Sequence, residues 1–465
     1  MIPGRPLFNS PTPLSRRNLC KWGALSATAM MLPKWTPPLL AQNVSSKWLI
    51  IESIDRVTLE VPFREIPARA MAKEIPHWVY SEVVQVRLKS GTIGFGETML
   101  FYTWGVPSDA VVKDAIGKNA AELMWRDDLG AGLQIALFDA VARALEVPVH
   151  ALLGQQLHSE TPLSWWNIDT SPDDMAAECK LAYDQGYLAY KTKGRPWFDL
   201  WEQMERSTAV VPAEFKIDMD FNDTLLDAER GMGILKQFEH YPQVDIWETP
   251  IPQGDIEGNR KITAEMNAKV AMHYGNPEPL DVFRTKACDG FVVGGSARSL
   301  IETNAVCAAA DLPFWLQLTG TGITAAWSLH FGGVLSQAKW PAVNCHQLYT
   351  HTLLTEPIVV RNGKAAVPDR PGLGYELDHD AIESFRTVKP GQRPDPPRLI
   401  ETTWPDGRRM YLGSHGVHNF LLTQANRGNI PYFERGVSTR LIPNDGSSEW
   451  KSLYDRAGPE KPLFI

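Results

Sequence analysis

The chain has 465 residues, a formal net charge of −8 and an apolar content of 44%. This length exceeds that of a usual single domain, so we expect either two packed units or one large barrel with additions. The acidic balance, with a pI near 5.8, argues against nucleic acid as the main partner. The 16 tryptophans are many for this length, and some of them should line a pocket or an interface.

Residues 1–42 have the composition of a targeting segment rather than of a folded domain. Arg16 and Arg17 form a twin-arginine pattern, and a moderately apolar stretch follows over residues 22–32. This stretch is too short for a stable membrane anchor. We therefore expect export by the twin-arginine route, in a folded state, to the periplasm or the outside of the cell. A disordered basic tail is the alternative interpretation.

Cys20 would leave with this segment, and four other cysteines remain. They are widely spaced and lack the short paired spacing of a zinc knuckle. We expect all four to be buried thiols even in an oxidising compartment. They are Cys179, Cys288, Cys307 and Cys345.

Residues 43–158 are predicted to form a small α+β domain. Residues 48–62 and 81–88 alternate as strands do, and residues 131–145 carry the apolar stripe of an amphipathic helix. The glycines of residues 91–97 predict a turn and a return strand, because no helix in a nucleotide-binding context follows them. Residues 64–79, with two prolines, are expected to be a loop over the site. Its candidate substrate contacts are Arg69, His77 and Trp78.

Residues 159–370 contain apolar runs separated by segments that are long enough for a helix, which predicts repeated βα units and a parallel sheet. Four of the runs end in polar residues at intervals of about 25 to 30 residues. In a (β/α)8 barrel, the C-terminal ends of the strands carry the active site. We therefore expect these polar residues to converge on one barrel mouth. They are Lys191 and Lys193, Asp218 and Asp220, Glu248, and His273.

Further positions face the same predicted mouth. Trp165 and Trp166 end the first strand of the barrel; one should line the pocket and the other should be core, and we take Trp165 as the substrate contact. Gln317 lies on the seventh strand. Thr319 opens a segment before a helix N-terminus, which is a common anion-binding place in barrels, although a plain loop is an equal alternative.

The last part of the chain changes in composition. Residues 371–395 are expected to return to the first domain, and residues 396–465, rich in proline, glycine and arginine, to form a β-rich extension. The predicted fold is therefore α/β: a (β/α)8 barrel with an α+β capping domain and a C-terminal β-rich extension.

Several motifs occur together, in a fixed order along the chain. They are the 91–97 hairpin, Lys191-Thr-Lys193, Asp218-Met-Asp220, Trp247-Glu248-Thr-Pro250, Gly294-Gly295 and Pro371-Gly-Leu-Gly374. In this order and spacing the chain resembles the enolase superfamily, mandelate racemase/muconate-lactonising branch, over roughly residues 50–385.

The resemblance implies an isomerase or lyase that removes the α-proton of a carboxylate while a divalent cation stabilises the enediolate. By the same resemblance Lys193 is the base, Lys191 polarises the substrate carboxylate, and Asp218 and Glu248 bind the metal, which should be Mg²⁺. The implied partner is a small carboxylate, such as a sugar acid or an amino-acid derivative, and a homo-oligomer is a further expectation.

The chain departs from the family pattern at three places. No acid stands near His273, where the third metal ligand belongs, no lysine precedes Gly294, and Gly320-Thr-Gly322 replaces an acid before a helix. His273 is open to three interpretations: a metal ligand favouring Mn²⁺, Fe²⁺ or Zn²⁺, a substrate contact or general acid, or a structural residue. Asp220, where asparagine is usual, is either a third ligand or a partner of the lysines.

Hypotheses from different classes follow. The first is an enzyme with one base, which favours dehydration or cycloisomerisation over two-base racemisation. The alternative is a catalytically divergent or inactive barrel that acts as a binding protein, because a fold does not fix a function. A hydrolase that uses His273 with a transition metal is a third possibility.

Overall fold

The computed structural model describes residues 47–102 and 105–465. The twin-arginine segment predicted in residues 1–42 lies outside these residues, and export stays a prediction. No helix in the described part is long and apolar enough to cross a membrane. The four cysteines after Cys20 are buried and free, as predicted.

An antiparallel sheet in the order β1-β2-β3 begins the described chain. Its strands are β1 (Ile51–Glu60), β2 (Tyr80–Leu88) and β3 (Ile93–Met99). Helix α4 (Ala131–Ala144) packs closely on β3, since a Cβ at Gly94 would lie only 2.2 Å from the Ala140 nitrogen. The glycines of this hairpin therefore serve a turn and strand–helix packing, which confirms that part of the prediction.

Residues 64–79 form helices rather than the predicted loop. Helix α1 spans Glu65–Glu74, and a 3₁₀ turn, η2, spans Pro76–Val79. Pro67 stands in the first turn of α1 and Pro76 is the first residue of η2, and both are positions that need no backbone N–H. The loop prediction was wrong because proline disrupts the interior of a helix and not its first turn. The other short helices before the parallel sheet are α2 (Asp109–Ala115), α3 (Ala120–Leu123), η3 (Asp127–Leu129) and α5 (Val149–Leu153).

Seven parallel strands form a curled sheet in the order β10-β9-β8-β7-β6-β5-β4. A two-residue strand, β11 (Ala342–Val343), pairs with β4, and a bridge between Gln317 and Val343 ties it to the end of β10. An antiparallel hairpin on β4 makes the sheet mixed. The predicted βα repeats and parallel sheet are confirmed. The strands are β4 (Glu160–Trp166), β5 (Ala189–Lys193), β6 (Lys216–Asp220), β7 (Val244–Glu248), β8 (Lys269–His273), β9 (Gly290–Val293), β10 (Phe314–Leu316), and the hairpin β12 (Val360–Arg361) and β13 (Lys364–Ala366).

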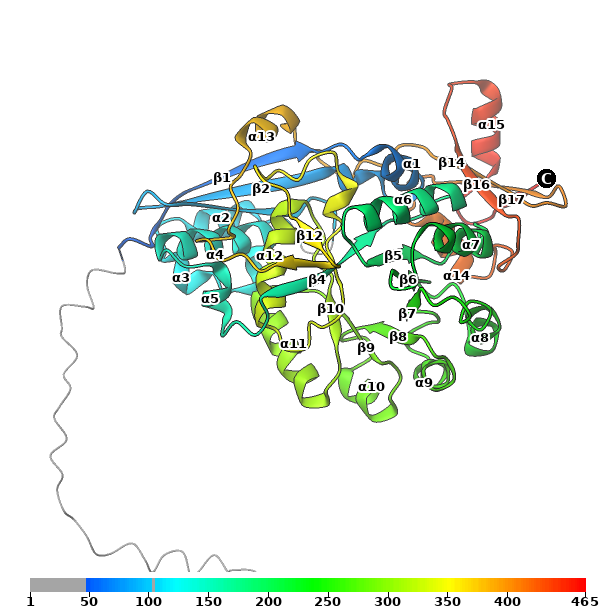
Figure 1. Ribbon diagram of the computed structural model, residues 1–465. Helices are drawn as coiled ribbons and strands as arrows, with labels where there is room; N and C mark the ends of the chain where they lie inside the picture. The colour runs from blue at the N-terminus through cyan, green and yellow to red at the C-terminus, as the bar shows by residue number, and fades with distance from the viewer. Residues whose placement is uncertain (1–46, 103–104) are drawn as a thin grey trace, which may run out of the picture. The chain divides into compact units, whose positions relative to one another are not determined.

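Helices follow the strands and surround the outside of the curled sheet (Figure 1). Ser171 caps the first of them, since its Oγ accepts a hydrogen bond from the Asp174 nitrogen at 3.2 Å and Pro172 begins the helix. The helices are α6 (Pro172–Asp184), α7 (Leu200–Val210), α8 (Ala228–Leu235), α9 (Ile256–Glu265), α10 (Pro279–Thr285), α11 (Ala297–Ala310), α12 (Gly322–Val334), the turn η4 (His346–Leu348) and α13 (His379–Phe385).

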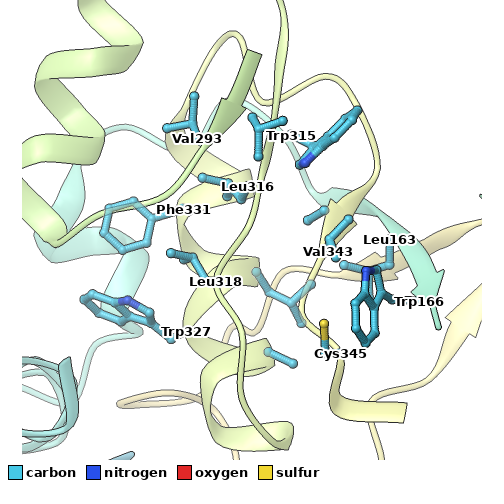
Figure 2. Close-up of a cluster of buried hydrophobic side chains, with 14 of the residues drawn as sticks. Leu163, Trp166, Val293, Trp315, Leu316, Leu318, Trp327, Phe331, Val343 and Cys345 are labelled. Carbon is cyan, nitrogen blue, oxygen red and sulfur yellow. The ribbon is translucent and has the colours of Figure 1, made fainter. Parts of the chain in front are cut away.

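The interior of the curled sheet is a packed core. Figure 2 shows side chains of β4, β9, β10 and β11 together, with Trp166 and Cys345 on one side of the view and Trp327 and Phe331 of α12 on the other. These side chains are all buried. His330 of α12 is buried as well and accepts a hydrogen bond from the His150 nitrogen at 3.1 Å, as expected for a core histidine.

Asp139 on α4 binds the segment that returns after the parallel sheet. Its carboxylate accepts hydrogen bonds from the nitrogens of Leu373 at 2.7 Å and Phe95 at 2.9 Å, and it pairs with Arg143. Burial raises the pKa of Asp139 to about 6 in spite of these contacts. One buried carboxylate therefore holds together α4, β3 and the Pro371–Gly374 motif.

The C-terminal residues form a second antiparallel sheet in the order β16-β14-β15-β17, coloured orange to red in Figure 1. A β-rich extension is thus confirmed. It packs around its own apolar core, which also takes in Trp197 and Phe198 from the loop after β5. The elements are β14 (Leu399–Thr403), β15 (Arg409–Gly413), α14 (Phe420–Asn426), β16 (Ser438–Ile442), α15 (Ser448–Arg456) and β17 (Leu463–Phe464).

Candidate active site

The ends of strands β5 to β7 bring polar side chains to two levels of the sheet. At the upper level the register aligns Lys193 with Asp220 and Asp220 with Glu248. At the lower level it aligns Lys191 with Asp218. Residues two apart on a strand share one face, so both levels belong to the same side of the sheet.

Each upper carboxylate is paired with a lysine. The Nζ of Lys193 donates to the Oδ2 of Asp220, and the Nζ of Lys191 forms an ion pair with the Oε2 of Glu248. Lys193 also donates to the Oδ1 of Asn222 at 3.0 Å. Two positive and two negative side chains thus lie together in a nearly water-free place.

The surroundings shift the pKa values of the two lysines in opposite directions. For Lys191, burial lowers the pKa, but the carboxylates of Glu248 and Asp220 outweigh it, so the pKa is raised and the ammonium group stays charged. For Lys193, burial and the nearby charges of Lys191 and Arg195 outweigh Asp220, so the pKa is lowered. The pair combines a fixed cation with a lysine that gives up its proton more readily.

Glu248 is paired with Lys191 and His273. Burial would raise its pKa, but the charge of Lys191 and the contact with His273 outweigh burial and lower it. The Nε2 of His273 lies 3.2 Å from the Oε1 of Glu248, and the Nζ of Lys191 contacts its Oε2. Each carboxylate oxygen therefore has one side-chain partner within the described ranges.

Asp218 lies outside this cluster. Its side chain is buried, and its Oδ1 has no hydrogen-bond partner among the described residues. Burial and the neighbouring Asp245 raise its pKa well above the usual value. The place beside Glu248 that the resemblance gives to Asp218 is taken by Asp220. Asn222 was missed, although the Asp-x-Asn pattern sought at Asp218 is met two residues later by Asp220-Phe-Asn222.

The divalent cation implied by the resemblance finds no matching set of ligands. In the part of the chain that the structure describes, no three His, Cys, Asp or Glu side chains come together in a way that could hold a metal ion. Asp220 and Glu248 are each neutralised by a lysine, and the third strand end offers the imidazole of His273 in place of an acid. These residues do not fit a three-carboxylate magnesium site.

A cavity of about 240 Å³ opens over the lysine–carboxylate cluster. Its lining brings together most of the predicted site residues: Lys191, Lys193, Asp220, His273, Gln317 and Thr319, together with Asn222 and Arg195. Apolar and aromatic side chains line it as well: Ile75, Trp78, Phe101, Tyr102, Trp166 and Ile168. Gln317 is also a direct partner of Lys191, whose Nζ donates to its Oε1 at 2.8 Å.

Trp166, and not Trp165, lines the cavity. Trp166 stacks on Trp78, with ring centroids 5.6 Å apart. Trp165 is buried in the core, where its Nε1 donates to Glu178 at 2.8 Å. The two side chains point to opposite faces because they are neighbours on one strand. The contact predicted for Trp165 therefore falls to Trp166.

The other candidates of residues 64–79 differ in their placement. Trp78 lines the cavity, as proposed. Arg69 pairs with Glu65 and Asp174. His77 does not line the cavity, and its ring lies 5.3 Å from that of His418.

The N-terminus of α12 binds the protein's own carboxylate. Glu97 accepts hydrogen bonds from the backbone nitrogens of Thr321 at 2.7 Å and Thr324 at 2.8 Å, and from the Oγ1 of Thr321 at 2.9 Å. Burial raises the pKa of Glu97, although these donors oppose the shift. The anion-binding interpretation of this segment is corrected accordingly, because these donors serve Glu97. Thr319 still lines the cavity.

Residues 174–381 match the family of enolase C-terminal domain-like proteins. In these residues the chain is similar to the enolase superfamily. Among its relatives, the N-succinyl-L-Arg/Lys racemase of Bacillus cereus is 22% identical over 347 residues, which are 66% of this chain and 90% of the racemase. A chloromuconate cycloisomerase of Cupriavidus necator is 25% identical over 378 residues, which are 72% of this chain and 98% of that enzyme.

The crystal structure of the muconate lactonizing enzyme from Pseudomonas fluorescens, complexed with muconolactone, shares the fold of this chain. The TM-score is 0.60 at 21% identity, and the match covers 73% of this chain and 100% of that chain. About a quarter of this chain therefore has no counterpart in that enzyme.

Proposed function

We propose that this protein is an isomerase or lyase that removes the α-proton of a small carboxylate substrate with a lysine base. The observation that carries the proposal is the opposite shift of the pKa values of Lys191 and Lys193 at the floor of one cavity. Titrating groups whose surroundings separate their pKa values are typical of acid–base catalysis. The relatives named above, a racemase and a cycloisomerase, support this general class.

Lys193 is the base in this proposal. A base must be neutral before it accepts a proton, and burial beside Lys191 and Arg195 lowers the pKa of Lys193 toward the working range. Asp220 and Asn222 both accept hydrogen bonds from its Nζ, which fixes the position of that atom at the cavity. These two residues position the base.

Lys191 supplies the positive charge for the enediolate. Its ammonium group stays charged, and it lies in a water-poor place where a fixed charge acts strongly on a developing anion. Gln317, which accepts from Lys191, lines the same cavity and can donate through its amide nitrogen. No step is assigned to a metal, because the ligand set does not fit one.

His273 is the candidate acid for a leaving group. Its side chain is 42% exposed and lines the cavity beside Glu248. Lys191 and Lys193, both on β5, are the only lysines among the described residues that line the cavity. Proton removal from one side favours dehydration or cycloisomerisation over two-base racemisation.

The apolar residues that line the cavity indicate the substrate's shape. Among them, Trp78 and Trp166 are stacked on each other. A flat or unsaturated apolar body fits there while its carboxylate reaches Lys191. We therefore propose a compact carboxylate with an aromatic or unsaturated body.

Proton exchange tests the proposal. The full chain is incubated in D₂O with mandelate, muconolactone or N-succinyl-lysine, and deuterium at the α-carbon is followed by NMR. The expected result is exchange with at least one of them, lost in Lys193→Met. Binding without exchange in the wild type would favour the alternative, a binding protein on an enzyme scaffold.

A further inference from the structure

The C-terminal extension contributes to the cavity. His418, Asn419 and Leu422, at the start of α14, line it together with the strand-end residues. The family match ends at residue 381, so these three side chains lie beyond the part of the chain that the enolase family accounts for. They add a wall that residues 174–381 alone do not provide.

The loop after β5 anchors this wall. Trp197 and Phe198, which closely follow Lys193 in the chain, are buried in the apolar core of the extension beside Phe420 of α14. A hydrogen bond supports this contact: the Oγ1 of Thr439, on β16, donates to the carbonyl oxygen of Trp197 at 2.5 Å. The loop that follows the candidate base and helix α14 therefore share one core.

The loop after β6 makes a second set of contacts. The Nδ2 of Asn426 donates to the carbonyl oxygen of Asn222 at 3.1 Å, and Asn222 is a partner of Lys193. The ring of Phe433 lies 6.1 Å from that of Phe221. Because the extension binds the loops that follow both Lys193 and Asp220, its position relative to the proposed base is fixed.

The three lining side chains suit an uncharged polar group. Burial and the charges of Arg393 and Arg398 lower the pKa of His418, so its imidazole is neutral at neutral pH and both donates and accepts. The amide of Asn419 makes no side-chain hydrogen bond to the start of α14. Leu422 adds an apolar surface next to them.

We infer that the extension completes the substrate pocket. His418 and Asn419 bind an uncharged polar substituent, such as a hydroxyl, at the end of the substrate remote from its carboxylate, and Leu422 limits the size of that end. This inference rests on the proposed function, which places the carboxylate at Lys191. It makes His418, Asn419 and Leu422 specificity-determining residues.

Two probes that differ by one hydroxyl group test the inference. Binding of mandelate and 4-hydroxymandelate to the full chain is measured by calorimetry, and α-proton exchange by NMR. The variants are His418→Ala, Asn419→Gly and Leu422→Trp; glycine is used at 419 because the backbone there has φ 51°. The control is Arg427→Trp, which places the same tryptophan on the exposed end of α14.

The wild type is expected to prefer 4-hydroxymandelate. His418→Ala and Asn419→Gly should each reduce this preference about tenfold, the loss of one buried hydrogen bond, and leave the affinity for mandelate unchanged. Leu422→Trp should weaken both probes, and Arg427→Trp neither. If Leu422→Trp fails to fold, the two smaller variants still decide the question.

The two proposals fail in different ways. If His418→Ala and Asn419→Gly both keep the wild-type preference for 4-hydroxymandelate over mandelate, the role of the extension is overturned, even if exchange proceeds. Probe binding that depends on His418 and Asn419, without any exchange, supports the extension and overturns the proposed chemistry. A wild type that binds neither probe overturns the role of the extension, whereas exchange with muconolactone or N-succinyl-lysine would still support the proposed chemistry.

Discussion

Two buried carboxylate settings in this protein differ in how they are satisfied. Glu97 lies at the N-terminus of α12, where backbone and hydroxyl donors bind both of its oxygens. Glu248 lies next to the residues that line the cavity, where it is paired with the ammonium group of Lys191 and lies 3.2 Å from the imidazole of His273. Backbone and hydroxyl groups satisfy the first carboxylate, whereas side chains that themselves line the cavity satisfy the second.

The difference indicates which carboxylate is structural and which belongs to a site. A buried carboxylate needs partners, and partners that also line a cavity can act on a ligand bound there. Glu97 joins β3 to α12, two elements far apart in the sequence. The cluster around Glu248 opens to a cavity that can admit a substrate. The predictions below test this contrast.

The largest expected effect is at the proposed base. Lys193→Met should reduce α-proton exchange about 10²- to 10⁴-fold, the usual contribution of a positioned general base. NMR in D₂O measures it. The matched control is Lys180→Met, at an exposed lysine of α6, which should leave the rate unchanged. Exchange at the wild-type rate in Lys193→Met would remove the lysine base from the mechanism.

The second-largest expected effect is on the stability of the fold, at Glu97. Glu97→Gln removes a charged acceptor. It also turns the NH₂ group of the new side chain toward backbone N–H groups, so that two donors face each other. The free energy of unfolding should fall by about 2 kcal/mol. Urea denaturation measures it, and the exchange rate of the folded variant should stay near that of the wild type. A variant as stable as the wild type would contradict the structural role of Glu97.

The two neighbouring tryptophans should separate affinity from stability. Trp166→Leu should weaken binding of an aromatic carboxylate such as mandelate about tenfold, since an aromatic contact is lost from the cavity. Trp165→Leu should instead lower the melting temperature and leave affinity unchanged, because its ring packs in the core and binds Glu178. Calorimetry and thermal unfolding distinguish them, and equal affinity losses would be inconsistent with the assignment.

The pH profile should move when Asp220 is neutralised. The base must be deprotonated, so kcat/KM should rise with pH through the pKa of Lys193, which lies below the usual 10.5. The charge of Asp220 raises that pKa, so Asp220→Asn should lower it further and shift the rising limb to lower pH. A limb that moves to higher pH would argue against Lys193 as the titrating group.

The smallest expected effect is that of metal removal. Because each upper carboxylate is paired with a lysine, dialysis against EDTA should leave the rate of exchange unchanged. Elemental analysis of the purified protein should find no stoichiometric magnesium. Stoichiometric metal that disappears in Asp220→Asn would restore the magnesium hypothesis.

Local patterns in the sequence determined much of the fold. Apolar runs and helix-length gaps predicted the βα repeats, and the alternation of residues 48–62 and 81–88 predicted the strands that the structure has as β1 and β2. The same patterns placed Lys191, Lys193, Glu248 and His273 at strand ends. These features depend on residues close together in the chain, so the sequence alone is sufficient to predict them.

Tertiary structure decided the details of the site. The register between β6 and β7 places Asp220, and not Asp218, beside Glu248. The face that β4 turns toward the cavity carries Trp166, and not Trp165. Glu97 reached α12 from 224 residues away in the chain, and the extension reached the cavity with His418. Such contacts depend on how distant elements pack, and no local periodicity records that packing.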